Sequence, residues 1–106
     1  MPLPASALRA RLAEMLTGEP DLELLARALE ISPALLSSNL SQQDLSFNQL
    51  LDQAREAQAL VLLANPALSL EQVASQLGFS SASSLGRAFR RWQDNTPLNY
   101  RRQVLG

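Results

Sequence analysis

One pattern of residues occurs twice along this chain, and this repeat constrains the fold more than any other feature. An offset of 48 residues, which becomes 49 after a turn, superposes the first copy on the second. The matched pairs are Leu22 with Leu70, Glu23 with Glu71, Ala26 with Ala74, Leu29 with Leu77, Ser32 with Ser80, Ala34 with Ala82, Leu36 with Leu85, Ser38 with Arg87 and Leu40 with Phe89. The repeat predicts two copies of one small structural unit.

Helix start and stop signals divide the first copy into two helices. Asp21 is a suitable N-cap for a helix over 21–29. Ser32 followed by Pro33 is a cap with proline at the first helical position, which opens a second helix over 33–42. Two short helices separated by a tight turn form a helix-turn-helix motif.

The second copy carries the same signals in the same order. Residues 69–72, Ser-Leu-Glu-Gln, form a capping box for a helix over 69–77. Gly78 suits the left-handed residue that follows such a helix. The next helix opens at Ser80 or Ser81 and runs to Gln93. The sequence therefore predicts a second helix-turn-helix motif.

The rest of the chain also has helical periodicity, and no stretch alternates as a strand would. Further helices are expected over 6–17, 46–64 and 96–103. The predicted fold is all-α, with about seven helices and two helix-turn-helix subdomains joined by a long linking helix. The predicted boundaries are a disordered lead (1–5), a first subdomain (6–45, motif about 21–42), a linking helix (46–64) and a second subdomain (65–106, motif about 69–93).

The composition excludes several classes of function. The 106 residues include no Cys and no His, which removes disulfides, the usual zinc sites, thiol nucleophiles and histidine bases. No phosphate-binding glycine loop is present, and no apolar run is long enough to span a membrane. We expect a cytoplasmic, nucleoid-associated protein that is not an enzyme, with no catalytic site, metal, cofactor or small-molecule ligand.

The net charge of −1 hides an uneven distribution. Residues 1–63 hold four Arg and eight acidic residues, whereas residues 64–106 hold five Arg and two acidic residues. Arg suits bidentate contacts with guanine and phosphate, although GC-rich coding explains the absence of Lys equally simply. The positive charge of the last third favours a nucleic-acid partner for the second copy.

The sequence resembles the AraC/XylS-type transcription regulators of bacteria, from about Ala5 to Arg102. The residues that carry the resemblance are Val73-Ala74, Leu77-Gly78-Phe79-Ser80, Leu85-Gly86-Arg87-Ala88-Phe89-Arg90-Arg91-Trp92, Thr96-Pro97 and Tyr100-Arg101. The first copy matches more loosely. The resemblance implies a C-terminal DNA-binding domain, which usually follows a sensing or dimerising domain in that family.

The predicted helix over 81–93 divides into a core face and a polar face. Leu85, Ala88, Phe89 and Trp92 form an apolar stripe at spacings of three and four, as a buried face requires. The opposite face carries small residues and Arg, which fits the major groove of DNA. The resemblance implies that bases are read by Ala82, Ser83, Gly86 and Arg87. We expect phosphate contacts from Arg90, Arg91 and the amide groups at Ser80 and Ser81.

The first copy predicts a weaker reader. The outward face of the helix over 33–42 carries Ala34, Ser37, Ser38 and Ser41, with no positive charge. Ala34, Ser37 and Ser38 are its candidate DNA contacts, and a purely structural scaffold is the alternative. Asp44 and Asp94 stand where the family commonly has glycine, and we expect the turn at Asp94 to survive in a left-handed conformation.

Two functions follow from these features. The main hypothesis is sequence-specific binding of double-stranded DNA for transcription regulation, as an activator or as a repressor. The alternative is a protein-interaction module that docks RNA polymerase, a co-regulator or the sensing domain through its acidic first half. Intramolecular bonds explain Arg55 and Arg101 about as well as contacts with DNA do.

Overall fold

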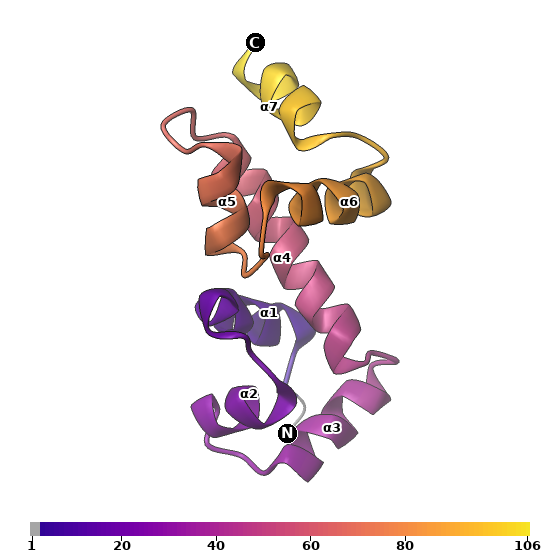
Figure 1. Cartoon of the computed structure of the whole chain (residues 1–106). Helices are drawn as coiled ribbons and strands as arrows, with labels where there is room; N and C mark the ends of the chain where they lie inside the picture. The colour runs from indigo at the N-terminus through magenta and orange to yellow at the C-terminus, as the bar shows by residue number, and fades with distance from the viewer. Residues whose placement is uncertain (1–2) are drawn as a thin grey trace. The chain divides into compact units, whose positions relative to one another are not determined.

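The computed structural model describes residues 3–106, and the part of the predicted lead at positions 1 and 2 lies outside this range. The described residues contain seven α-helices, one short 3-10 helix and no strand (Figure 1). The elements are α1 (Ala5–Ala13), η1 (Leu16–Gly18), α2 (Leu22–Ala28), α3 (Pro33–Gln42), α4 (Phe47–Leu63), α5 (Leu70–Gln76), α6 (Ala82–Gln93) and α7 (Pro97–Leu105). The predicted all-α class is confirmed.

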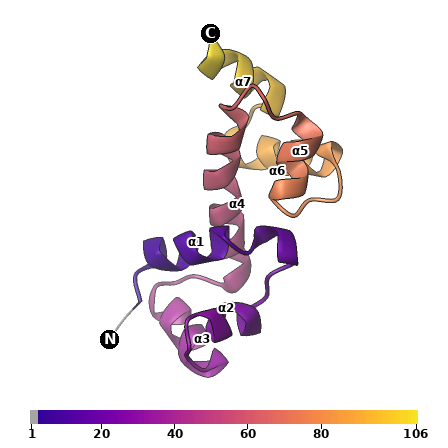
Figure 2. The same ribbon diagram turned by 90° about the vertical axis from the view of Figure 1, so that its left-hand side faces the viewer.

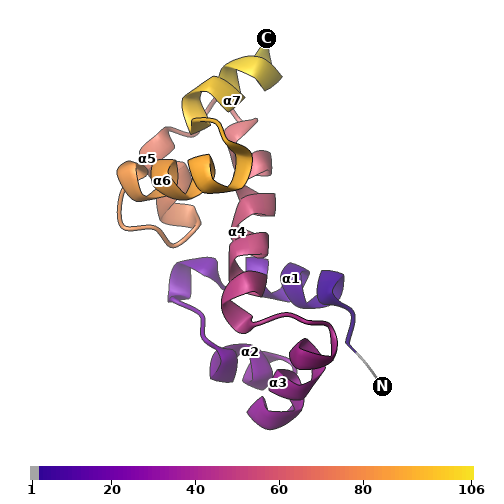
Figure 3. The ribbon, with the colours of Figure 1, turned by 90° about the vertical axis from the view of Figure 1, so that its right-hand side faces the viewer.

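The chain divides into two compact units within α4. The first unit runs to Arg55, and the second extends from Glu56 to Gly106. In the first unit α2 packs against α3 (Figure 2), and in the second unit α6 packs against both α5 and α7 (Figure 3). Each predicted pair of motif helices thus forms a packed pair within its own unit.

Each helix of the first unit contributes at least one buried leucine to its core. Its fully or almost fully buried apolar residues are Leu8, Leu12, Leu16, Leu25, Ala26, Leu36, Leu40, Leu50 and Ala54. The helix predicted over 6–17 is shorter than expected, because the α-helix ends at Ala13 and the 3-10 helix follows it. Leu16 is buried in this tighter turn, and Glu19 after it has a left-handed φ of 52°.

The start of the described chain differs from the disordered lead predicted over 1–5. The amide of Leu3 donates to Asn39 Oδ1 at 3.0 Å, and the carbonyl of Leu3 accepts from Gln43 Nε2 at 2.8 Å. Asn39 is buried and also donates to the carbonyl of Leu35. Ala5 already belongs to α1. The side-chain amides of Asn39 in α3 and of Gln43 directly after it therefore hold the backbone of Leu3.

The second unit combines small apolar residues with an aromatic cluster. Phe89 is buried and contacts Trp92 and Tyr100, at ring-centroid distances of 6.4 and 5.6 Å. Trp92 also contacts Phe79 at 6.1 Å. These contacts confirm that Phe89 and Trp92 lie on the core side of α6, and they add the half-buried Phe79 and Tyr100 to the same cluster.

The turn between the two motif helices has the same geometry in both copies. The amide of Ile31 donates to the carbonyl of Ala26 at 3.0 Å, and that of Phe79 donates to the carbonyl of Ala74 at 2.9 Å. In each case the chain passes through one left-handed residue, with φ of 57° at Glu30 and 86° at Gly78. This arrangement is the Schellman motif that satisfies the last carbonyls of a helix.

Other predicted end signals hold as well. The capping box at Ser69 and Gln72 is complete, and Ser81 rather than Ser80 caps α6. Asp94 takes the left-handed conformation expected of it, with a φ of 52°. Asp44 does the same after α3, with a φ of 56°. Acidic residues thus occupy left-handed positions that glycine fills with less strain.

The shared turn predicts opposite effects for two substitutions. Glu30→Gly should raise the free energy of opening of the first unit by about 0.5–1 kcal/mol, because glycine relieves the left-handed strain. Gly78→Ala should lower that of the second unit by about 1–2 kcal/mol. Native-state hydrogen exchange at the amides of Leu36 and Phe89 reports the two units separately.

Glu30→Ala is the matched control, because it removes the same carboxylate from the end of α2 and keeps a Cβ atom. If Glu30→Ala stabilised the first unit as much as Glu30→Gly, charge and not backbone strain would explain the gain.

Candidate nucleic-acid interface

The beginning of α6 is built from three serines. Ser81 Oγ accepts from the amide of Ser84 at 3.2 Å and caps the helix. The hydroxyls of Ser80 and Ser81 each lie 3.3 Å from Ser84 Oγ. Arg87 Nη2 then donates to Ser84 Oγ at 3.3 Å. This contact holds the exposed guanidinium of Arg87 towards the first turn of α6.

The two faces of α6 have the predicted difference in burial. Leu85, Ala88 and Phe89 are buried against the unit. Among the candidate contact residues on this helix, Ser83, Arg87, Arg90 and Arg91 are exposed, and Ser81, Ala82 and Gly86 are half-buried. A face of small residues with exposed arginines is therefore presented to solvent by a helix whose other face is fixed in the core.

Gly86 lies in the middle of α6 without a structural reason of its own. A Cβ atom built at this position meets nothing within 4 Å, and Gly86 is not among the residues with positive φ. Glycine costs about 0.5–1 kcal/mol relative to alanine inside a helix. Because Gly86 has no side chain, the helix surface beside Arg87 carries no atoms beyond the backbone at this position.

Arg101 serves the fold and not the exposed face. Its Nε donates to the carbonyl of Leu63 at 2.8 Å, and its Nη2 donates to the carbonyl of Asn65 at 3.1 Å. These bonds satisfy carbonyls at the end of α4, so the intramolecular alternative for Arg101 holds. The adjacent Arg102 is exposed.

The candidate contacts of the first unit lie on α3. Ala34, Ser37, Ser38 and Ser41 are exposed, and Ser32 caps the helix by accepting from the amide of Leu35 at 3.1 Å. The ten residues of α3 include no charged side chain. The exposed face of α3 therefore differs from that of α6 in having hydroxyl groups without a cation.

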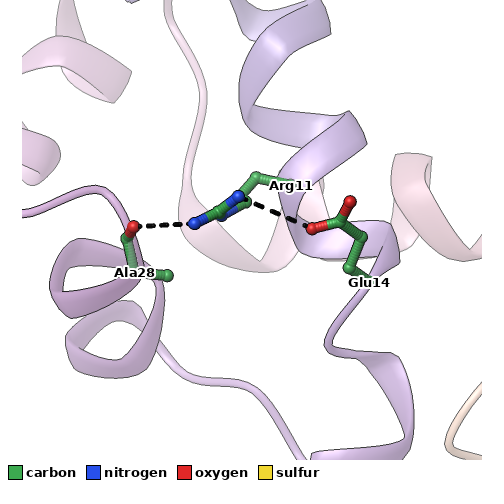
Figure 4. Close-up of polar contacts among 3 residues, drawn as sticks. All are labelled: Arg11, Glu14 and Ala28. Atoms are coloured by element: carbon green, nitrogen blue, oxygen red, sulfur yellow. Dashed lines mark hydrogen bonds and ion pairs between the residues drawn. The ribbon is translucent and has the colours of Figure 1, made fainter.

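Several arginines of the first unit make contacts within that unit. Arg11 donates to the carbonyl of Ala28 at 3.1 Å and pairs with Glu14 at 3.7 Å, across a shallow hollow lined by small residues of α1 and α2 (Figure 4). Arg9 donates to Gln53 Oε1 at 3.0 Å. Partial burial lowers the pKa of the Arg55 guanidinium, although the neighbouring Asp52 carboxylate raises it. Arg9 and Arg11 thus join α1 to α4 and to α2.

Comparisons with known proteins agree with this arrangement. A family model described as a helix-turn-helix domain matches residues 25–103. The HTH-type transcriptional regulator VirS of Mycobacterium tuberculosis is 40% identical over 85 residues, which cover 80% of this chain and 25% of that protein. The crystal structure of a DNA-binding transcriptional dual regulator from Escherichia coli K-12 has a TM-score of 0.79 at 29% identity, covering 92% of each chain.

A further solved structure is the DNA-binding domain of AdpA, a global transcriptional factor in complex with a target DNA. It has a TM-score of 0.71 at 27% identity, and the match covers 94% of this chain and 91% of that one. The chain belongs to the AraC-type family of helix-turn-helix transcription regulators. This family is one of DNA-binding regulators and not of enzymes.

This AraC-type domain spans about a quarter of the length of the first curated relatives that it matches. Within residues 3–106, none of the helices combines the length and the apolar character needed to cross a membrane. The family match covers both motif pairs, because residues 25–103 include most of α2 and all of α3, α5 and α6.

The contacts of Arg101 predict a stability effect that its neighbour lacks. Arg101→Ala should lower the free energy of unfolding of the second unit by about 1–2 kcal/mol, because two carbonyls lose a charged donor. Arg102→Ala, on the exposed side of the same helix, should change it by less than about 0.5 kcal/mol. Urea unfolding followed by Trp92 fluorescence measures both variants. Equal effects of the two substitutions would contradict the structural role of Arg101.

Proposed function

We propose that this domain binds specific sequences of double-stranded DNA, with α6 in the major groove and α3 as a second, weaker contact. The observation that carries this proposal is the exposed face of α6, where Ser84 holds Arg87 beside the open backbone of Gly86. Recognition helices of this motif place their first turns against base edges.

Each residue of the α6 face has a role in the proposal. Arg87 donates to O6 and N7 of a guanine, the commonest specific contact in the major groove. Ala82, Ser83 and Gly86 allow the helix to approach the bases closely. The arginines at 90 and 91 and the amide at Ser81 contact phosphates, which position the helix without reading sequence.

The α3 face makes the second contact through Ala34, Ser37 and Ser38. Hydroxyl groups can donate to and accept from several bases, so a serine face discriminates less strongly than an arginine. We also propose the predicted subdomain boundaries at 45 and 64. They separate the two helix-turn-helix motifs, so that each subdomain makes one of the two DNA contacts.

The acidic first unit suits a protein partner in addition to DNA. Up to Arg55 the chain has four Arg and seven acidic residues, whereas from Glu56 onwards it has five Arg and three. We propose that the surface of this unit outside the α3 contact face meets RNA polymerase or a sensing domain. The site of action is then the nucleoid, in the cytoplasm.

The proposal predicts a loss of selectivity in Arg87→Ala. The ligand is a duplex that the parent domain selects from a random library, with a scrambled duplex as the reference. The substitution should remove about 1–3 kcal/mol of preference for the selected duplex, measured by fluorescence anisotropy. Arg90→Ala is the control, because a phosphate contact should weaken both duplexes alike and lower the salt slope by about one.

If the Arg87→Ala variant kept the parent's preference for the selected duplex, Arg87 would not be a base-reading residue. A folded parent domain that selected no duplex at all, with no salt dependence, would overturn the proposed function and leave the protein-docking alternative.

Gly86→Ala should separate stability from binding. The added methyl group has room and should raise the free energy of unfolding by about 0.5–1 kcal/mol, because alanine favours the helix. In the proposed complex the same methyl group meets the DNA, so affinity for the selected duplex should fall. Calorimetric unfolding and anisotropy measure the two quantities. Unchanged affinity in the more stable variant would argue against close approach at Gly86.

A further inference from the structure

An exposed leucine interrupts the polar surface of α3. Leu35 is 50% exposed, although its neighbour Leu36 is fully buried. The other large apolar residues that are exposed lie on α4 and α7, namely Val61, Leu98, Val104 and Leu105. Leu35 is therefore the single large apolar side chain that α3 exposes, and no charged residue of that helix accompanies it.

The repeat shows what Leu35 replaces. With the offset of 49 that pairs Leu36 with Leu85, Leu35 falls on Ser84 and Ser38 falls on Arg87. In the second unit these two positions form the hydrogen bond that holds Arg87. In the first unit the same two positions carry an apolar side chain and a hydroxyl group. At these two positions the first copy thus differs in chemistry from the pair that we propose to read guanine in the second copy.

The backbone of Leu35 is held on both sides. Its amide donates to Ser32 Oγ at 3.1 Å, and its carbonyl accepts from Asn39 Nδ2 at 3.3 Å. Asn39 is only 6% exposed and is itself held by the amide of Leu3 at 3.0 Å. These bonds fix the start of the leucine side chain in the first turn of α3, the part of a recognition helix that meets base edges.

We infer that Leu35 is a specificity-determining residue that contacts the C5-methyl group of a thymine. The inference rests on the proposed function of α3. The thymine methyl is the apolar group that bases of unmodified DNA present in the major groove, and apolar side chains recognise it. The hydroxyl of Ser38 suits the N6 or N7 edge of the adenine in the same pair. The two motifs then read different pairs, A·T by α3 and G·C by α6.

A protein partner fits this surface less well. Protein interfaces depend on clusters of large apolar or aromatic anchors at their centre. Around Leu35 the exposed residues of α3 are small, with Ala34, Ser37 and Ser38 in the same turns. One leucine among small residues suits a single methyl group better than a large apolar partner.

The test replaces the methyl group and the leucine in turn. In the duplex selected by the parent domain, each thymine is exchanged for deoxyuridine, which removes only the C5-methyl. At one position in the half-site of the first motif, the affinity of the parent should fall about threefold to fivefold, as expected for burial of about one methyl group. Leu35→Ala should bind the thymine duplex with a similar loss and no longer distinguish thymine from deoxyuridine there.

Leu98→Ala is the matched control. Leu98 is 43% exposed on α7, outside the proposed contact surface, so this variant should keep the discrimination of the parent. Circular dichroism checks that Leu35→Ala keeps its helices, as expected for an exposed side chain.

Three outcomes are decisive. Loss of the thymine preference in Leu35→Ala alone supports the inference. A parent domain that selects a duplex yet binds every deoxyuridine version equally well overturns the inference and leaves the proposed function standing, and retained discrimination in Leu35→Ala does the same. A parent domain that selects no duplex contradicts the proposed function itself.

Discussion

Two hydrogen bonds organise both units, from the amide of Ile31 to the carbonyl of Ala26 and from that of Phe79 to the carbonyl of Ala74. Each closes the turn after the first motif helix and sets where the second helix can begin. The serine N-caps at positions 32 and 81 then start α3 and α6. Because the turn is closed by backbone atoms, the side chains of the second helix remain available for a core on one face and a contact surface on the other.

The two contact surfaces share this scaffold and differ in chemistry. On α6, burial of Leu85 and Phe89 leaves Arg87 outward, and the serines of the first turn orient it. On α3, burial of Leu36 and Leu40 leaves hydroxyl groups and one leucine outward. In each copy the buried positions are set by packing, whereas the outward positions are free to differ.

Features with local causes were predictable from the sequence. Caps, the capping box at Ser69 and the left-handed turns at Gly78 and Asp94 depend on residues close in the chain, so their signals are visible without a structure. The apolar stripe on α6 followed from helical periodicity in the same way. The outward face of α6 was predicted as its complement, and its residues are exposed or half-buried.

Features that depend on residues far apart in the chain were not predictable from the sequence. The contacts of Leu3 with Asn39 and Gln43 join residues about forty positions apart, and no local pattern marks them. Leu16 lies in a 3-10 helix and is buried, and the burial of this side chain depends on residues outside its own segment. The left-handed Glu30 was missed because the turn imposes a conformation that glutamate does not favour alone. Leu35 became notable only when its exposure was known.

The left-handed acidic residues also bear on how the two copies can evolve. Glu19, Glu30 and Asp44 of the first unit all have positive φ, whereas in the described part of the second unit Asp94 is the one residue other than glycine that does. Every codon for Glu or Asp becomes a glycine codon by a single nucleotide change. The first unit therefore lies one mutation away from relief of strain at three separate positions. Single substitutions could therefore raise the free energy of unfolding of this unit, as is common in natural proteins. Such substitutions could also offset destabilising changes elsewhere in the unit.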